Sequence, residues 1–188
     1  MKKVYLDNAA TTELDAEVLA IMTESMKTDY GNPSSSHVFG RKSRSTIETS
    51  RRSIANLLNA DASEIFFTSG GTEADNMAIR GAVRDAGIKH VITSKIEHPA
   101  VINTVAHLVN KGKISVDYVD LNDDGVVDLL HLEHLLSNNS NTLVSLMHGN
   151  NEIGNLLDIK AVSLLCQKHD ALFHSDTVQT IGHYMFNL

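Results

Sequence analysis

Two glycines followed by a threonine form the first segment of the sequence that could bind an anion. Gly70, Gly71 and Thr72 stand between a short apolar run and a stretch of helical period. Glycine lets the backbone approach an anion closely, and the start of a helix offers unpaired N–H groups and the positive end of its dipole. Thr72 adds a hydroxyl group. The motif indicates a phosphate site, although two glycines before a helix also serve as an ordinary tight turn.

Two further segments carry an imidazole and a pair of amides. His98 stands just before an expected helix, where it could cap that helix, lie flat on a planar heteroaromatic ligand or carry a proton near neutral pH. Asn150 and Asn151 are neighbours in the segment 148–154. Their amides could hydrogen-bond a phenolic oxygen, or they could form an Asx turn, which Asn beside Gly favours.

A carboxylate follows the last apolar run of the chain. Asp176 comes directly after residues 171–175, where an acid is costly unless it is paired. A protonated pyridine nitrogen is a fitting partner, because the acid keeps that nitrogen charged and lets the ring accept electrons. The alternative is a cap for a following helix.

These polar groups need a scaffold, and the sequence predicts an α/β fold with a mostly parallel sheet and flanking helices. Short runs of β-branched and aromatic residues alternate with stretches of helical period, as in βαβ units. We expect strands at 64–69, 90–94, 114–119, 142–147 and 171–175. We expect helices at 16–27, 40–58, 72–84, 99–110, 128–136 and 158–169. Ligands of such sheets bind outside the carboxyl ends of the strands, so all four polar segments should meet at one edge.

Composition limits the classes of protein to which the chain can belong. Its 188 residues suffice for one substantial core, and the net charge of −7 without a basic stripe argues against a nucleic-acid partner. No apolar stretch approaches the roughly 20 residues that cross a bilayer, and no signal peptide is recognisable. The lone cysteine, Cys166, cannot form an internal disulfide. We therefore expect a soluble protein of a reducing compartment, the cytoplasm.

Four segments resemble the cysteine desulfurases, enzymes of the class V aminotransferase family that depend on pyridoxal 5'-phosphate. They are YLDNAATT at 5–12, GNPSS at 31–35, FTSGGTE at 67–73 and HGNNEIG at 148–154. The match is similar to the nitrogen-fixation and iron–sulphur-cluster branch. The resemblance implies an incomplete large domain of a fold type I pyridoxal-phosphate transferase at 16–188, preceded by an N-terminal arm at 1–15.

The resemblance also implies roles for individual residues. The Gly71 backbone and Thr72 would bind the phosphate of the cofactor. His98 would stack on the pyridine ring and act in proton transfer. Asp176 would contact the pyridine nitrogen, so that His98 and Asp176 are the catalytic candidates.

Two amide side chains complete the cofactor site that the resemblance implies, since Asn151 and Gln179 would contact the phenolic oxygen. Family members convert L-cysteine to L-alanine and a persulphide on an enzyme cysteine. They pass the sulphur to acceptor or cluster-scaffold proteins for iron–sulphur cluster assembly or tRNA thiolation, and they form homodimers.

The chain departs from the family pattern in two respects. The family's Schiff-base lysine lies well beyond the aspartate that matches Asp176, whereas here Lys168 is the last lysine. Cys166 stands within an expected helix, where a small buried hydrophobe is the favoured interpretation over a nucleophile. We expect a truncated chain that lacks the Schiff-base lysine and the nucleophilic cysteine and is inactive alone.

Other interpretations remain open at this point. The chain could be a non-catalytic fragment or one half of a split enzyme. Its parent could instead be another class V aminotransferase or a selenocysteine lyase. His131 and His134 share a helical face but lack a cysteine or a close acidic trio, so we expect a solvated face there and no metal site.

Overall fold

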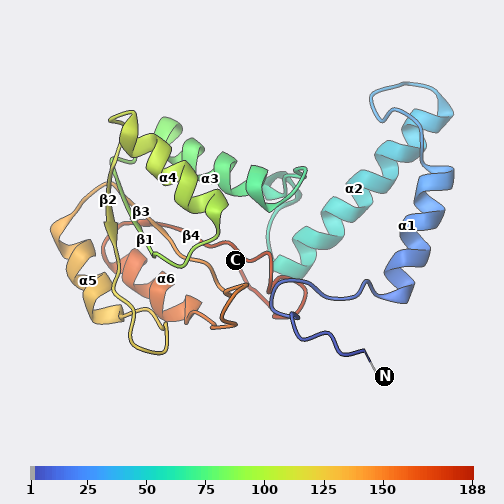
Figure 1. Ribbon diagram of the computed structural model, residues 1–188. Coiled ribbons are helices and arrows are strands. Elements are labelled where there is room, and N and C mark those ends of the chain that lie inside the picture. The colour runs from blue at the N-terminus through green and yellow to red at the C-terminus, as the bar shows by residue number, and fades with distance from the viewer. Residues whose placement is uncertain (1–2) are drawn as a thin grey trace. The chain divides into compact units, whose positions relative to one another are not determined.

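The computed structural model describes residues 3–188, so the first two residues of the expected arm lie outside it (Figure 1). The chain forms two compact units. The first combines the residues up to Ala10 with Thr68–Thr180, and the second combines Thr11–Phe67 with Ile181–Leu188. The division into an arm at 1–15 and a large domain at 16–188 stays a prediction.

A parallel four-stranded sheet forms the centre of the first unit. Its strands are β1 (His90–Thr93), β2 (Ser115–Tyr118), β3 (Thr142–Ser145) and β4 (Leu172–His174), in the order β2-β1-β3-β4. All three pairings are parallel. Four of the five expected strands are thereby confirmed, and so is the fold class.

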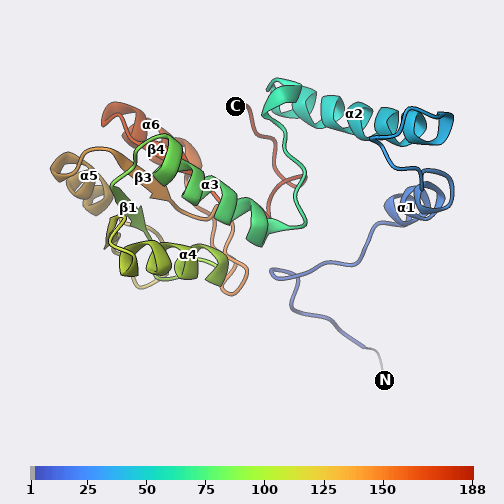
Figure 2. The same ribbon diagram turned by 90° about the horizontal axis from the view of Figure 1, so that it is seen from above.

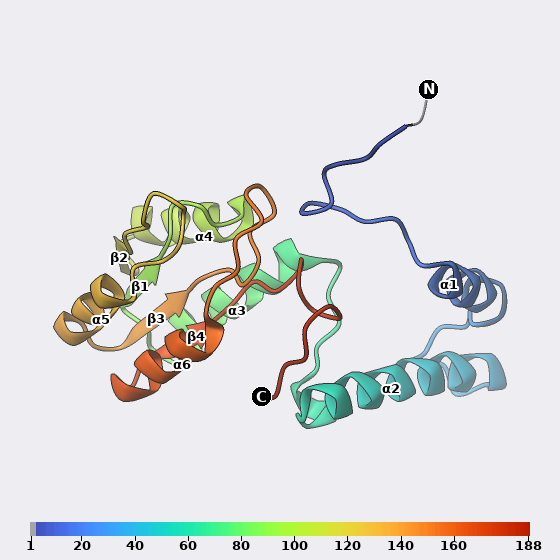
Figure 3. The same ribbon diagram turned by 90° about the horizontal axis from the view of Figure 1, so that it is seen from below.

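Helices cover both faces of this sheet (Figure 3). The helices are α3 (Gly71–Asp85) and α4 (Pro99–Asn110) on one face, and α5 (Leu129–Asn138) and α6 (Ile159–Lys168) on the other. Alternate strand residues supply two cores, because successive side chains of a strand point to opposite faces. Val91 and Leu143 pack with α3 and α4, whereas Ile92 and Val144 pack with α5 and α6. Each such fully buried side chain stabilises the fold by about 1.5–3 kcal/mol.

The strand expected at 64–69 is wrong. The 3₁₀ turn η1 (Ala62–Glu64) covers its first residue, and the rest belongs to no strand. Among the described residues it pairs with no other strand; instead the Arg51 guanidinium donates to the Ile65 carbonyl and lies 4.8 Å from the Phe67 ring centroid. This run has a high β-propensity, but it forms no strand because no neighbouring strand in the described part of the chain pairs with it.

The second unit is built on two helices, α1 (Ala16–Thr28) and α2 (Val38–Leu58), as expected (Figure 2). Asp29 connects them, because its carboxylate pairs with Lys42 at 2.9 Å and accepts a hydrogen bond from Thr46 at 3.1 Å. The segment between the helices is a loop, and His37 caps α2 by accepting the Gly40 N–H at 3.3 Å. No residue of α1 is buried. In the described part of the chain, no helix is long and apolar enough to cross a membrane.

Candidate functional site

A cavity of about 280 Å³ lies in the first unit, beyond the carboxyl ends of its strands. All six residues expected to bind a cofactor line it. The lining consists of Ala10, Gly71, Thr72, Asp75, His98, Met147, Asn151, Asp176, Val178 and Gln179. The structure thus brings the six expected residues, which are up to 108 positions apart in the sequence, together at one edge of the sheet.

The start of α3 forms one wall of the cavity and has no side-chain cap. The N-cap is Gly70, and the first intrahelical bond runs from the Ala74 N–H to the Gly70 carbonyl at 3.1 Å. The N–H groups ahead of Ala74 have no intrahelical acceptor, which suits them to an anion. A Cβ at Gly71 would stand 2.7 Å from Val178 Cγ2, so a larger residue at this position would require the Val178 side chain to shift.

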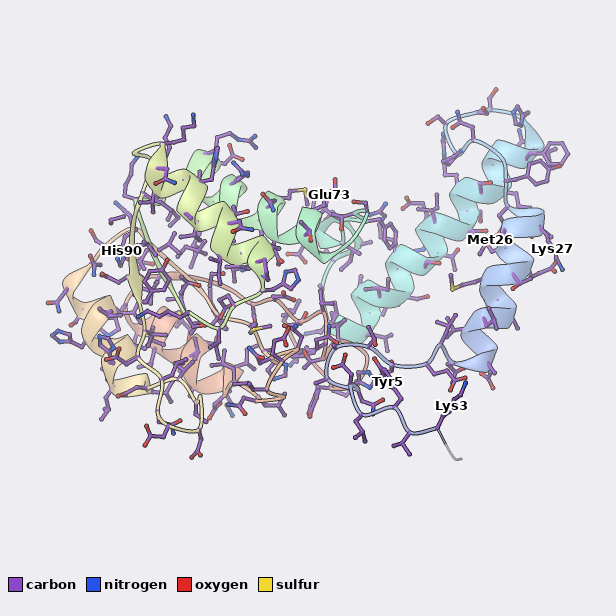
Figure 4. The ribbon with its side chains drawn as sticks, in the orientation of Figure 1. Lys3, Tyr5, Met26, Lys27, Glu73 and His90 are labelled. Atoms are coloured by element: carbon purple, nitrogen blue, oxygen red, sulfur yellow. The ribbon has the colours of Figure 1, made fainter. Side chains whose placement is uncertain are left out.

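Glu73 closes the glycine turn and was not anticipated from the sequence. Its Oε2 accepts the Ser69 N–H at 2.6 Å and the Ser69 hydroxyl at 2.7 Å. The backbone N–H of Ser69, and then its hydroxyl, hold the pKa of the Glu73 carboxyl below its usual range. Figure 4 shows Glu73 at the amino end of α3. The Glu73 carboxylate therefore fixes the conformation of the turn. Because Glu73 lies in the first turn of α3, its negative charge also interacts favourably with the helix dipole.

His98 caps α4 and lines the cavity at the same time. Its Nδ1 accepts the Ala100 N–H at 3.1 Å, and Pro99 occupies the first turn. His98 can therefore cap the helix through one ring nitrogen and still face a ligand in the cavity. Because Nδ1 is the acceptor, the neutral ring carries its proton on Nε2. The cap leaves Nε2 available for hydrogen bonding or proton transfer in the cavity.

Asp176 is a buried carboxyl group two residues beyond β4. Its Oδ1 accepts the Val178 N–H at 2.9 Å, and the residue is 8% exposed. Burial raises the pKa of Asp176 and the charge of Asp75 adds to the rise, whereas the Val178 N–H and the imidazole of His98 act in the opposite direction. The carboxyl group caps no helix, since a turn follows it. A cation in the cavity would offset the cost of ionising this acid.

The two neighbouring asparagines have different surroundings. Asn150 is buried, donates to the Ile96 carbonyl at 2.8 Å and accepts the Glu152 and Ile153 N–H groups. Asn150 therefore forms the Asx turn that the sequence offered as one alternative. Asn151 instead lines the cavity, and its Nδ2 donates to Glu152 Oε1 at 3.0 Å.

Asp75 is a second acid of the cavity that the sequence analysis missed. It is 4% exposed, and its Oδ1 lies 3.5 Å from His174 Nε2. The other ring nitrogen of His174 lies 2.9 Å from Ser145 Oγ on the adjacent strand. The sequence could have indicated Asp75, because it stands three residues after Thr72 on α3 and residues three apart share one helix face.

Cys166 lies within α6 and is 2% exposed. Burial raises the pKa of its thiol to about 12, which leaves almost no thiolate at neutral pH. The interpretation of this residue as a small buried hydrophobe is confirmed. Among the described residues, no three His, Cys, Asp or Glu side chains are grouped to hold a metal ion.

Known sequences resemble this chain along its whole described length. The model of the aminotransferase class-V family matches residues 4–188. A curated relative, the cysteine desulfurase IscS of Dictyoglomus turgidum, is 44% identical over 190 residues, which cover 100% of this chain and 48% of the relative. The chain spans about half the length of the curated relatives it matches.

Solved structures show the same similarity. A NifS-like protein superposes with a TM-score of 0.90 at 38% identity, over 100% of this chain and 52% of that protein. A structure of SspA in complex with cysteine superposes with a TM-score of 0.88 at 33% identity, over 97% of this chain and 53% of SspA. The sheet and its helices therefore have the arrangement found in NifS-like proteins.

Proposed function

Because the chain belongs to the class-V aminotransferase family, we propose that it supplies the cofactor-binding part of a pyridoxal-phosphate-dependent cysteine desulfurase. Such an enzyme converts L-cysteine to L-alanine and an enzyme-bound persulphide. The observation that carries the proposal is the cavity, in which a helix start, an imidazole, two amides and a buried acid converge. The relatives named cysteine desulfurase and the cysteine complex of SspA support the choice of substrate.

The residues of the cavity fit pyridoxal phosphate. The uncapped N–H groups of α3 and the Thr72 hydroxyl suit a phosphate, and Gly71 leaves no side chain in its way. Burial raises the pKa of Asp176, and a protonated ring nitrogen beside it would stabilise the ionised form of this acid. Asn151 and Gln179 offer amide donors for a phenolic oxygen.

When bound, the cofactor supplies a ring that accepts electrons from the substrate. Asp176 would hold the proton at the ring nitrogen. His98 would lie on the ring and move a proton at its Nε2, because its Nδ1 is committed to the Ala100 N–H. The lining within the described residues contains neither lysine nor cysteine, so we propose that this 188-residue chain holds the cofactor non-covalently and does not turn over alone.

Further properties of the whole enzyme follow the family. It would act as a homodimer in the cytoplasm and deliver sulphur to acceptor or scaffold proteins for cluster assembly or tRNA thiolation. Supporting these points are the family match and the names of the relatives.

Retention of pyridoxal phosphate by the purified chain tests the proposal. The chain is loaded, dialysed with and without borohydride, and digested for mass spectrometry. We expect retention without one specifically labelled lysine. Specific labelling of one lysine would contradict the non-covalent mode, and loss of the cofactor on dialysis would contradict the binding function.

A further inference from the structure

A buried carboxyl group lies directly behind the wall of the cavity. Glu97 precedes His98 in the chain, is 5% exposed and is absent from the cavity lining. Its Oε1 accepts the Ser94 hydroxyl at 2.7 Å, and its Oε2 accepts the Met147 N–H at 2.9 Å. Both carboxyl oxygens therefore have a donor.

These two bonds join the ends of neighbouring strands. Ser94 follows β1 and Met147 follows β3, and the two strands pair in parallel. Met147 lines the cavity, and so does His98, the residue next to Glu97. Glu97 thus holds two residues of the cavity wall, Met147 and His98, in position, although Glu97 itself does not line the cavity.

Charged groups approach Glu97 from the side of the cavity. Asp75 on α3 and Asp176 beyond β4 both disfavour its ionised form. The imidazoles of His98 and His148 belong to the neighbouring turns, and burial lowers the pKa of His148. Ionised Glu97 would therefore face two other carboxylates in a setting of low dielectric constant.

Glu97 lines a second cavity, of about 20 Å³, that offers it no compensating charge. Among the described residues that line this cavity, Glu97 is the only one with an ionisable side chain. Burial first, and then the charges of Asp176 and Asp75, raise the pKa of Glu97 to about 7, although the bonds from Ser94 and Met147 act to lower it. Near neutral pH this carboxyl group is thus poised between its two forms.

We propose that Glu97 is a positioning residue of the cavity, which clamps the His98 turn to the end of β3 and exchanges a proton with solvent in response to the charge at Asp176. The inference rests on the proposed function in one respect: the protonated ring nitrogen of the bound cofactor would be the positive charge that offsets Asp176. A cation beside Asp176 weakens the field that keeps Glu97 protonated, so binding releases a proton from Glu97 to the buffer.

The backbone amide of Met147 reports on Glu97 without any ligand, because it donates to Oε2. Its ¹⁵N and ¹H shifts are followed from pH 5 to pH 9 in the ligand-free chain. We expect an inflection near pH 7 that is lost in Glu97→Gln. Glutamine keeps the shape, accepting from Met147 and donating to Ser94, but cannot titrate.

The coupling to Asp176 is tested in the same titration. Asp176→Asn removes the neighbouring charge, so the Met147 inflection should move to lower pH by a few tenths of a unit or more. Asp75→Asn should move it in the same direction. Glu24→Gln on α1, an exposed acid that is not among the residues lining the cavity, is the matched control and should leave the inflection unchanged. An inflection that survives in Glu97→Gln, or that Asp176→Asn fails to move, would overturn the proposal.

Proton release on binding gives the second readout. Pyridoxamine 5'-phosphate, which has no aldehyde, is titrated calorimetrically at pH 7 in two buffers of different ionisation enthalpy. Wild type should release more protons per ligand than Glu97→Gln, and equal release would contradict the coupling. If wild type does not bind this ligand, the proposed function fails, while the ligand-free titrations still decide the role of Glu97.

Discussion

Two histidines at opposite ends of the same sheet differ in what their ring nitrogens contact. His90 begins β1, and its nitrogens lie 3.2 Å from Thr142 Oγ1 and 3.0 Å from Asp117 Oδ2. His98 lies beyond the carboxyl end of β1 and has one nitrogen in a helix cap and the other available in a cavity. The polar side chains of His90, Thr142 and Asp117 at the amino edge bond to one another between strands, whereas the carboxyl edge, besides such bonds, leaves polar atoms for a ligand. The number of committed ring nitrogens, rather than the residue type, therefore distinguishes His90 from His98, the histidine for which we propose a function.

The largest effect that we expect is on the pH dependence of stability, which the ionisation of Glu97 at the carboxyl edge produces. The pKa of Glu97 is about 7 in the folded chain against an ordinary value of 4.5. Between these values the folded chain binds more protons than the unfolded chain, so stability falls as pH rises through this window. Glu97→Gln should remove roughly 3 kcal/mol of this pH dependence, at about 1.4 kcal/mol per pKa unit. Urea denaturation at pH 5 and pH 8 measures it, and an unchanged dependence in the variant would contradict the assignment.

Matched acid-to-amide changes at the two edges should separate ligand binding from strand pairing. Asp176→Asn removes the acid proposed to hold a charged ring nitrogen, so affinity for pyridoxal phosphate should fall by about 1.5–3 kcal/mol, or roughly 10- to 150-fold. Asp117→Asn, beside His90, should leave that affinity unchanged. Absorbance titration of the cofactor gives both values. Equal losses in the two variants would mean that the edges do not differ in function.

Much of this contrast could be predicted from the sequence, and the remainder depended on contacts between distant residues. Pro99 marks the start of α4, and all six expected site residues reach one cavity. Glu97 was missed because its partner Met147 is 50 residues away, and no local pattern encodes that bond. The strand expected at 64–69 fails for a related reason, since a run such as Ile65 to Phe67 needs a neighbouring strand that propensity alone does not provide.

Two glycines of α3 offer a matched pair of alanine substitutions. A Cβ at Gly71 would press on Val178, whose N–H holds Asp176, so Gly71→Ala should weaken cofactor binding about tenfold, or 1.4 kcal/mol. Nothing lies within 4 Å of a Cβ at Gly81, so Gly81→Ala should stabilise the helix by about 0.5–1 kcal/mol and leave binding unchanged. Cofactor titration and thermal denaturation of both variants check this, and normal binding by Gly71→Ala would contradict the phosphate assignment.

The smallest effect separates the two roles of His98. Asparagine is a good N-cap, so His98→Asn should retain the stability of α4, whereas His98→Ala should lose about 1 kcal/mol. Both variants remove the ring and should weaken cofactor binding alike. Denaturation combined with cofactor titration tests this separation. If His98→Asn bound the cofactor as wild type does, the ring would have no role in the cavity.

The central claim is that the carboxyl edge of the sheet, and not its amino edge, receives the cofactor. Chemical-shift mapping with pyridoxamine 5'-phosphate on the ¹⁵N-labelled chain tests this claim most directly. We expect the largest perturbations at the amides of Gly71, Thr72, Asn151 and Gln179, and none at His90 or Thr142. Perturbations centred on His90 and Thr142, or none at saturating ligand, would contradict the account.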